Sequence, residues 1–148
     1  LHFFSNTNKF FYDSFQLLKN NGILLLVFID IHSSNNEFYF YNYFDGVKEK
    51  DEKRFLQKEV IINLLKENNY KILSIDNVEH ISRLFYGEEV FSDPFLNKEQ
   101  SSQLAFLTNE VYQKGLIIIR KQIKLNPEKS FRTEITFWGM TAQKINRT

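Results

Sequence analysis

The clearest pattern in the chain is an amphipathic segment followed directly by an uninterrupted apolar run. A helix is predicted over residues 8–18 from apolar side chains that repeat on one face and from a polar residue at its start. These residues are Phe11, Phe15 and Leu18, with Asn6 or Thr7 as the N-cap. Gly22 is the predicted left-handed residue that ends the helix. Residues 23–29 are all apolar, which predicts a strand buried on both faces, as in a parallel sheet covered by helices on each side.

Two polar residues follow this strand. Asp30 ends it, and His32 opens a cluster of turn-forming residues at 32–36. A carboxylate at the carboxyl end of a parallel strand lies where open α/β sheets bind their ligands. Asp30 is equally suited to cap the turn that follows, and both interpretations stay open.

An aromatic and charged excursion is predicted over residues 37–54. Six of the eight residues at 37–44 are aromatic, which is typical of a wall over a small cationic substrate or of side chains that pack on the sheet. The mixed charges of 48–54 predict a solvated loop.

The rest of the chain alternates helical and extended patterns. A second helix is predicted at 55–68, ended by Asn68 and Asn69, and a strand at 70–79 that continues irregularly to 87. Asn97 and Gln100 have the spacing of a capping box, so a helical insertion is expected over 95–127, with a break at Gly115. The last strand is predicted at 133–144, with Ile135, Phe137, Gly139 and Thr141 on one face and Thr136, Trp138 and Met140 on the other.

Composition narrows the function classes. The 148 residues suit one domain with one core, and a net charge of +1 provides no field for nucleic acid or an anionic membrane. The absence of cysteine excludes disulfides and thiolate chemistry, and the three histidines are too far apart for a spaced metal motif. Residues 23–29 are far fewer than the ~20 that span a bilayer, and the cytoplasm is the default compartment. The composition indicates no oligomeric state.

The chain begins with Leu rather than Met, inside an apparent strand end, which predicts a fragment without its amino-terminal part. The opening Leu1-His2-Phe3-Phe4, the helix that ends in Gln-Leu-Leu-Lys-Asn-Asn-Gly at residue 22, and the strand 23–29 resemble class I S-adenosylmethionine-dependent methyltransferases after their cofactor half. The resemblance implies an α/β fold, the C-terminal half of a Rossmann-like sheet from the end of strand 4 through strand 7. Its last two strands would form an antiparallel pair, filled here by 71–82 and 133–144.

The glycine-rich half that holds the cofactor is absent from this sequence. Its five glycines are isolated from one another, and no acidic residue stands ~20 positions after a glycine-rich turn. The 148 residues are therefore expected to form one partial domain that binds S-adenosylmethionine weakly and is inactive alone.

Within the superfamily, the chain is most similar to the histamine N-methyltransferase family. Ser33-Ser34 followed by aromatics and Gly46 resembles the amine-pocket segment of that family. The resemblance implies that His2 and Phe3 contact the cofactor. Carried over residue by residue, the resemblance places Phe38 or Tyr39, Asn42 or Tyr43, and Thr133 at the amine. With Asp30 and His32 after the first strand and Phe85 across from the aromatic segment, the expected substrate-binding residues are Asp30, His32, Phe38, Tyr39, Tyr43, Phe85 and Thr133. His2 either takes a proton from the acceptor or only fills the strand end, and no metal is implied.

Three functions are consistent with these patterns. The first is a methyltransferase that acts on a small molecule, an amine in particular, with S-adenosylmethionine as cofactor and neither nucleic acid nor membrane as partner. The second is a non-catalytic methyltransferase-like binding or scaffold subunit. The third is an unrelated α/β module that binds small aromatic or cationic ligands.

Overall fold

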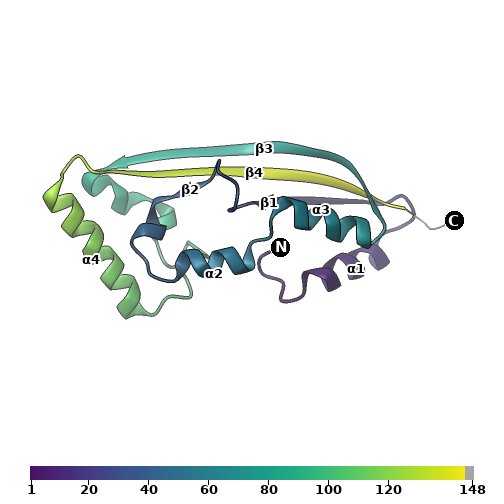
Figure 1. The fold of residues 1–148 in the computed structure, drawn as a ribbon, viewed down its shortest axis with the longest axis horizontal. Coiled ribbons are helices and arrows are strands. Elements are labelled where there is room, and N and C mark those ends of the chain that lie inside the picture. Colours follow the sequence, from purple (N-terminus) through teal and green to yellow (C-terminus); the bar gives the residue numbers. More distant parts are fainter. Residues whose placement is uncertain (146–148) are drawn as a thin grey trace. The chain divides into compact units, whose positions relative to one another are not determined.

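The computed structural model describes residues 1–145 (Figure 1). The chain divides into two compact units, each with its own core. Unit 1 contains residues 1–36, 53–80 and the described residues from 136 onward, and unit 2 contains residues 37–52 and 81–135. Two long strands, β3 (Tyr70–Tyr86) and β4 (Ser130–Lys144), contribute residues to both units.

Unit 1 is a small sheet with two helices on one face, α1 (Thr7–Leu17) and α3 (Lys58–Glu67) (Figure 1). Strand β1 (Ile23–Ile29) pairs antiparallel with β4, in a register from Ile23 opposite Gln143 to Ile29 opposite Phe137. Strand β3 pairs with β4 as well. The predicted bounds of β1 and the pairing of the last two strands are confirmed.

The prediction that β1 is parallel and buried on both faces is wrong for the part of the chain that the structure describes. Leu26 and Phe28 are buried, whereas Leu25 and Val27 are 65% and 56% exposed. The reason is that α1 and α3 lie on the same face of this strand, so side chains on the other face remain uncovered (Figure 1). An apolar sequence does not reveal which of its two faces a helix covers.

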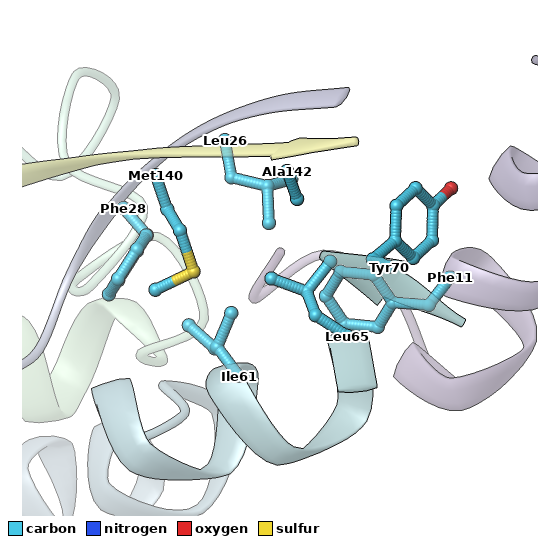
Figure 2. Close-up of a cluster of buried hydrophobic side chains, with 8 residues drawn as sticks. All are labelled: Phe11, Leu26, Phe28, Ile61, Leu65, Tyr70, Met140 and Ala142. Atoms are coloured by element: carbon cyan, nitrogen blue, oxygen red, sulfur yellow. The ribbon is translucent and has the colours of Figure 1, made fainter. Parts of the chain in front are cut away.

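The core of unit 1 lies between that face and the two helices. Figure 2 shows side chains from the strands pointing toward side chains of α3, with Phe11 of α1 beside them. The cluster consists of Phe11, Leu26, Phe28, Ile61, Leu65, Tyr70, Met140 and Ala142. Full burial of such side chains stabilises a fold by roughly 1.5–3 kcal/mol each.

The ends of the two helices differ slightly from the prediction. Asn6 caps α1 by accepting a hydrogen bond from the Lys9 amide at 2.9 Å. The left-handed residue after α1 is Asn21, with φ of 61°, and not Gly22. Gly22 is required instead by a close approach, since a Cβ there would lie 2.8 Å from the Lys19 carbonyl oxygen.

Helix α3 begins at Lys58, three residues later than predicted, and Asn69 with φ of 61° ends the turn after it. Both asparagines occupy the left-handed region that few other residues tolerate.

Unit 2 contains most of the excursion and the insertion. Its short elements are β2 (Glu37–Phe38), the 3₁₀ turns η1 (Tyr39–Asn42), η2 (Gly87–Ser92) and η3 (Pro94–Leu96), and most of α2 (Val47–Arg54). Strand β2 pairs antiparallel with β4, Phe38 opposite Thr133.

The loop predicted at 48–54 is instead helix α2. Val47 and Asp51, one turn apart, are both fully buried, and Lys48 pairs with Glu52 at 3.9 Å across the next turn. The charged residues therefore cover the outer face of a helix whose buried face has only two positions, too few for a periodic pattern to be recognised.

The predicted insertion contains one helix, α4 (Asn109–Leu125), capped by Thr108, whose hydroxyl accepts from the Val111 amide at 3.3 Å. Asn97 does not begin a helix: its side chain accepts from the Glu99 amide at 2.9 Å in a local turn. The predicted break at Gly115 is also wrong, because α4 is continuous there. A Cβ at Gly115 would lie 2.3 Å from the Phe44 ring, so the glycine permits close packing.

The last strand begins at Ser130, three residues earlier than predicted, ends at Lys144 as predicted, and does not keep a constant alternation. Phe131, Thr133 and Ile135 are buried in unit 2, whereas Thr136, Met140 and Ala142 are buried in unit 1. Apart from Gly139, the buried positions change from odd to even between Ile135 and Thr136, which strict alternation does not predict.

Candidate functional site

The first candidate site is a cavity in unit 1 beside the carboxyl end of β1, with a volume of about 190 Å³. Three separate segments and two further side chains form its wall. The lining residues are Leu1, His2, Phe3, Val27, Phe28, Ile29, Phe55, Leu56, Ile61 and Phe137. The two residues predicted to contact a cofactor, His2 and Phe3, both lie in this wall.

His2 is held by aromatic contacts. Its ring is stacked on Phe55, with centroids 4.4 Å apart and planes at 23°, and tilted against Phe3 at 4.0 Å and 44°. Phe3 is 76% exposed, so its ring is accessible to a ligand. The stack fixes the orientation of the imidazole and leaves it half-buried at the cavity wall.

Asp30 has a capping role in the structure. Its Oδ1 accepts from the His32 amide at 3.0 Å and its Oδ2 accepts from the Lys58 amide at 2.9 Å. Asp30 is 6% exposed, and hydrogen bonds from backbone amides to a carboxylate satisfy both of its oxygens. Asp30 therefore fixes the turn after β1 and the start of α3.

His32 is also tied to the backbone. Its Nε2 lies 3.0 Å from the Phe55 carbonyl oxygen, an arrangement in which a proton on that nitrogen makes the hydrogen bond. Asp30 and His32 border a second, polar hollow of about 380 Å³, whose other lining residues are Ser33, Ser34, Gln57, Lys58, Glu59 and Trp138. The Lys58 ammonium lies 4.2 Å from the centroid of the Trp138 ring. This hollow therefore already holds a cation against its aromatic side chain.

The aromatic segment at 37–44, predicted either as a substrate wall or as side chains that pack, forms core in unit 2. Phe38, Tyr39, Phe40 and Phe44 are at most 6% exposed. The Tyr39 hydroxyl donates to Asp93 Oδ2 at 3.0 Å. Burial first, and then the Asp93 carboxylate, raise the pKa of Tyr39 far above its ordinary value. Most of the segment thus packs inside the unit.

Tyr43 is the exception, because it is half-buried at the side of a third hollow of about 420 Å³. Its ring lies 5.8 Å from Phe131, and burial raises its pKa. The hollow is lined by Glu37, Tyr39, Asn42, Tyr43, Lys129, Ser130 and Arg132. Two predicted substrate residues, Tyr39 and Tyr43, are therefore brought together with side chains of both charges.

Thr133 and Phe85 complete the predicted set. Thr133 is fully buried in β4, paired with Phe38, and its Oγ1 has no hydrogen-bond partner. Phe85 is half-buried in β3. Of the nine predicted residues, the four at positions 2, 3, 30 and 32 belong to unit 1, and the other five belong to unit 2.

Sequence reasoning missed part of the first cavity. Phe55, Leu56, Ile61 and Phe137 lie far from His2 in the chain and were assigned only to a helix face or a strand. No local signal identifies them, because each has the composition of an ordinary core position. Phe55 alone could have been noticed, as an aromatic at the start of a predicted helix.

Residues 1–145 contain neither a cluster of metal-binding side chains nor a helix that could span a membrane. In this part of the chain, no group of three or more histidine, aspartate or glutamate side chains could hold a metal ion. No helix there combines the length and the apolar character needed to cross a bilayer.

Comparisons with known proteins give a fold but no family. No protein-family model matches the sequence, and no curated protein matches it. Among solved structures, the chain is similar to a candidate methyltransferase from Bacillus halodurans C-125, with a TM-score of 0.56 and 18% identity over 98% of this chain and 66% of that chain. A weaker match is phosphoethanolamine N-methyltransferase 2 from Haemonchus contortus, solved with phosphomonomethylethanolamine and S-adenosylhomocysteine. That match has a TM-score of 0.40 and 12% identity, over 98% of this chain and 31% of that chain.

At this level of identity, the similarity to the first structure shows the fold alone. The chain spans just under two thirds of that protein's length. The α/β class expected from the sequence is confirmed. The chain has a methyltransferase-like fold.

Proposed function

We propose that the protein is an S-adenosylmethionine-dependent methyltransferase of small molecules, and that residues 1–145 form the acceptor side of it. The observation that carries this proposal is the place of β4, the last strand. It follows a helical insertion and lies antiparallel between β1 and β3. The fold similarity to the candidate methyltransferase, over 98% of this chain, supports the same class.

Residues 1–145 do not by themselves fit the whole cofactor. The cavity of about 190 Å³ is smaller than the ~300–1,000 Å³ of sites for drug-sized ligands. No carboxylate lines it that could bind ribose hydroxyls, and no glycine-rich loop lies in this part of the chain. In the complete enzyme, S-adenosylmethionine would supply the methyl group, held mainly by other residues, and this chain alone would be inactive.

In this proposal, residues 1–145 position the methyl acceptor. Methyl transfer is accelerated mainly by holding the two reacting groups in near-attack geometry.

For the acceptor, we propose a small amine. The support comes from the hollow in unit 2, where the ring of Tyr43 and the carboxylate of Glu37 lie in one wall. An aromatic face and a carboxylate both attract an ammonium group. Lys129 and Arg132 line the same hollow, so acceptors with a carboxylate are the competing class.

The experiment uses the complete open reading frame that contains this sequence. S-adenosylhomocysteine formation is measured with panels of small amines, carboxylic acids and phenols. Amines should be preferred, and Tyr43→Ala should raise their KM about tenfold, in line with ~1.4 kcal/mol of lost binding. The control, Tyr12→Ala, alters a tyrosine that is 57% exposed in α1 and should change nothing. Preference for a carboxylic acid would overturn the amine assignment, and absence of any turnover would overturn the enzyme assignment.

A non-catalytic methyltransferase-like binding or scaffold subunit is the second candidate. The incomplete fit of the cofactor to the first cavity favours it. Calorimetric titration of the same complete protein with S-adenosylhomocysteine separates the two. Saturable binding at micromolar concentration supports the enzyme, whereas no binding up to the millimolar range supports the scaffold.

A further inference from the structure

We propose that the cavity beside the carboxyl end of β1 binds a single uncharged aromatic ring. This binding does not depend on the proposed function. The cavity lies wholly within unit 1, and three lines of observation lead to this ligand class.

The first observation is the chemistry of the wall. Nine of the ten lining residues have apolar side chains, and the tenth is His2. None of the ten is Asp, Glu, Lys or Arg. A charged group placed here would lose its hydration without gaining an opposite charge from a side chain, which disfavours it strongly. The α-ammonium of Leu1 is the one charged group beside the wall, and burial lowers its pKa.

The second observation is the volume. Apolar cavities of ~150 Å³ lined by Leu, Ile and Phe stay dry and bind benzene. The cavity here, at about 190 Å³, holds one six-membered ring with one or two further atoms. It is too small for a nucleoside, whose sugar and base together exceed a single ring. Its size therefore fits a single ring better than the nucleoside of the cofactor.

The third observation is the solvent exposure of two side chains in the cavity wall. Phe3 is 76% exposed and Val27 is 56% exposed, although both line the cavity. A bound ring would remove part of this apolar surface from water, which is favourable in proportion to its area. Phe55 supports the wall from within, since it is 7% exposed and stacked on His2.

His2 adds a polar ring to the wall. It is the one polar side chain among the ten lining residues, and its stack on Phe55 fixes the plane of its ring. Its Nε2 is buried, so a bound ring meets the imidazole by packing.

Binding is measured by ligand-observed NMR titration on the 148-residue chain with its amino terminus acetylated, so that Leu1 carries no ammonium beside the cavity. The probes are phenol, benzene, benzoate and adenosine. We expect saturable binding of phenol, with benzoate at least tenfold weaker because its charge would be desolvated. Adenosine binding more tightly than phenol would overturn the proposal and assign the cavity to the cofactor. Equal affinity for benzoate and phenol would also overturn it.

Substitutions on one strand localise the ligand. Val27→Phe should fill the cavity from its exposed side and weaken phenol binding about tenfold or more, as loss of a well-packed ring contact does. Leu25→Phe is the matched control, because Leu25 lies on the same face of β1, is 65% exposed and does not line the cavity. Equal affinity for phenol in both variants would overturn the site.

A second variant tests whether weaker binding reflects the cavity itself and not a change in folding. Phe3→Ala alters a largely exposed residue outside the core cluster and should also weaken phenol binding. Turnover by the complete protein then separates the two proposals. Ring binding without methyl transfer would refute the proposed function and leave the site, whereas methyl transfer without ring binding would refute the site and leave the function.

Discussion

The two units bury different kinds of side chain. The core cluster of unit 1 is apolar apart from the hydroxyl of Tyr70, and its one buried carboxylate, Asp30, lies in a turn (Figure 2). Unit 2 buries two carboxylates among its aromatic residues, Asp51 and Asp93, at 0% and 2% exposure.

Each of these two buried carboxylates accepts a hydrogen bond from a tyrosine of the 37–44 segment. Asp51 accepts from the Tyr41 hydroxyl at 2.8 Å and from Gln103 Nε2 at 2.6 Å. Asp93 accepts from the Tyr39 hydroxyl and forms an ion pair with Arg83 at 3.5 Å. These bonds fix the segment inside the unit.

Unit 1, in contrast, keeps apolar surface open to solvent. Ile23, Leu25 and Val27 of β1 are all at least 45% exposed, and the first cavity lies beside the end of this strand. The difference shows that a dense aromatic sequence is not a sign of a ligand site when polar partners inside the fold hold it. Open apolar surface beside a cavity is the better sign.

The largest effect on stability is expected from truncating a buried side chain in the core of unit 1. Leu65→Ala removes a side chain with 0% exposure and should lower the free energy of unfolding by about 2–5 kcal/mol. Hydrogen exchange should show reduced protection in α1, β1 and α3 more than in α4. Leu17→Ala, at a position that is 86% exposed, is the control and should stay within ~0.5 kcal/mol. Equal loss of protection in α4 would show that the two units unfold together.

A pair of tyrosine variants tests the polar difference between the units. Tyr39→Phe leaves Asp93 with one donor fewer and should cost about 1–3 kcal/mol in urea unfolding. The Tyr70 hydroxyl in unit 1 is buried without a hydrogen-bond partner, so Tyr70→Phe should be neutral or stabilising. A cost for Tyr70→Phe equal to that for Tyr39→Phe would contradict the contrast.

Stability at alkaline pH should depend on Tyr39 of unit 2. Because the folded pKa of Tyr39 is raised above 10, the unfolded chain releases this proton first as the pH rises. The stabilisation is complete below pH ~10 and is lost above it, at about 1.4 kcal/mol per pH unit for one group. Unfolding at a series of pH values from 9 to 11 should show a shallower decline for Tyr39→Phe. Identical slopes for parent and variant would show that another group dominates.

The smallest effect on stability is expected at the open face of unit 1. The free edge and the uncovered apolar residues of β1 should make the 148-residue chain self-associate. Leu25→Lys should shift sedimentation toward the monomer while changing the free energy of unfolding by no more than ~0.5 kcal/mol. Leu17→Lys in α1 is the control. If the unmodified chain is monomeric and melts in one sharp cooperative transition, the exposed apolar face of β1 is stable in water without a partner.

Local chemistry in the sequence determined the elements and many of their ends. The seven apolar residues at 23–29 form β1, Asn6 caps α1, and Asn69 follows α3 in the left-handed conformation. Such features depend on neighbours within about four residues, so a linear pattern contains them.

Tertiary structure alone decided what each element faces. The same apolar run was consistent with two covered faces, yet α1 and α3 cover only one. Asp30 was equally suited to a ligand or a cap until the Lys58 amide, 28 residues away, was found to donate to it. The cavity joins His2 to Phe55 and Phe137, residues whose meeting depends on long-range packing rather than on any local preference. Burial and partnership are properties of the folded surroundings, and for that reason the sequence predicted the elements of this protein better than its site.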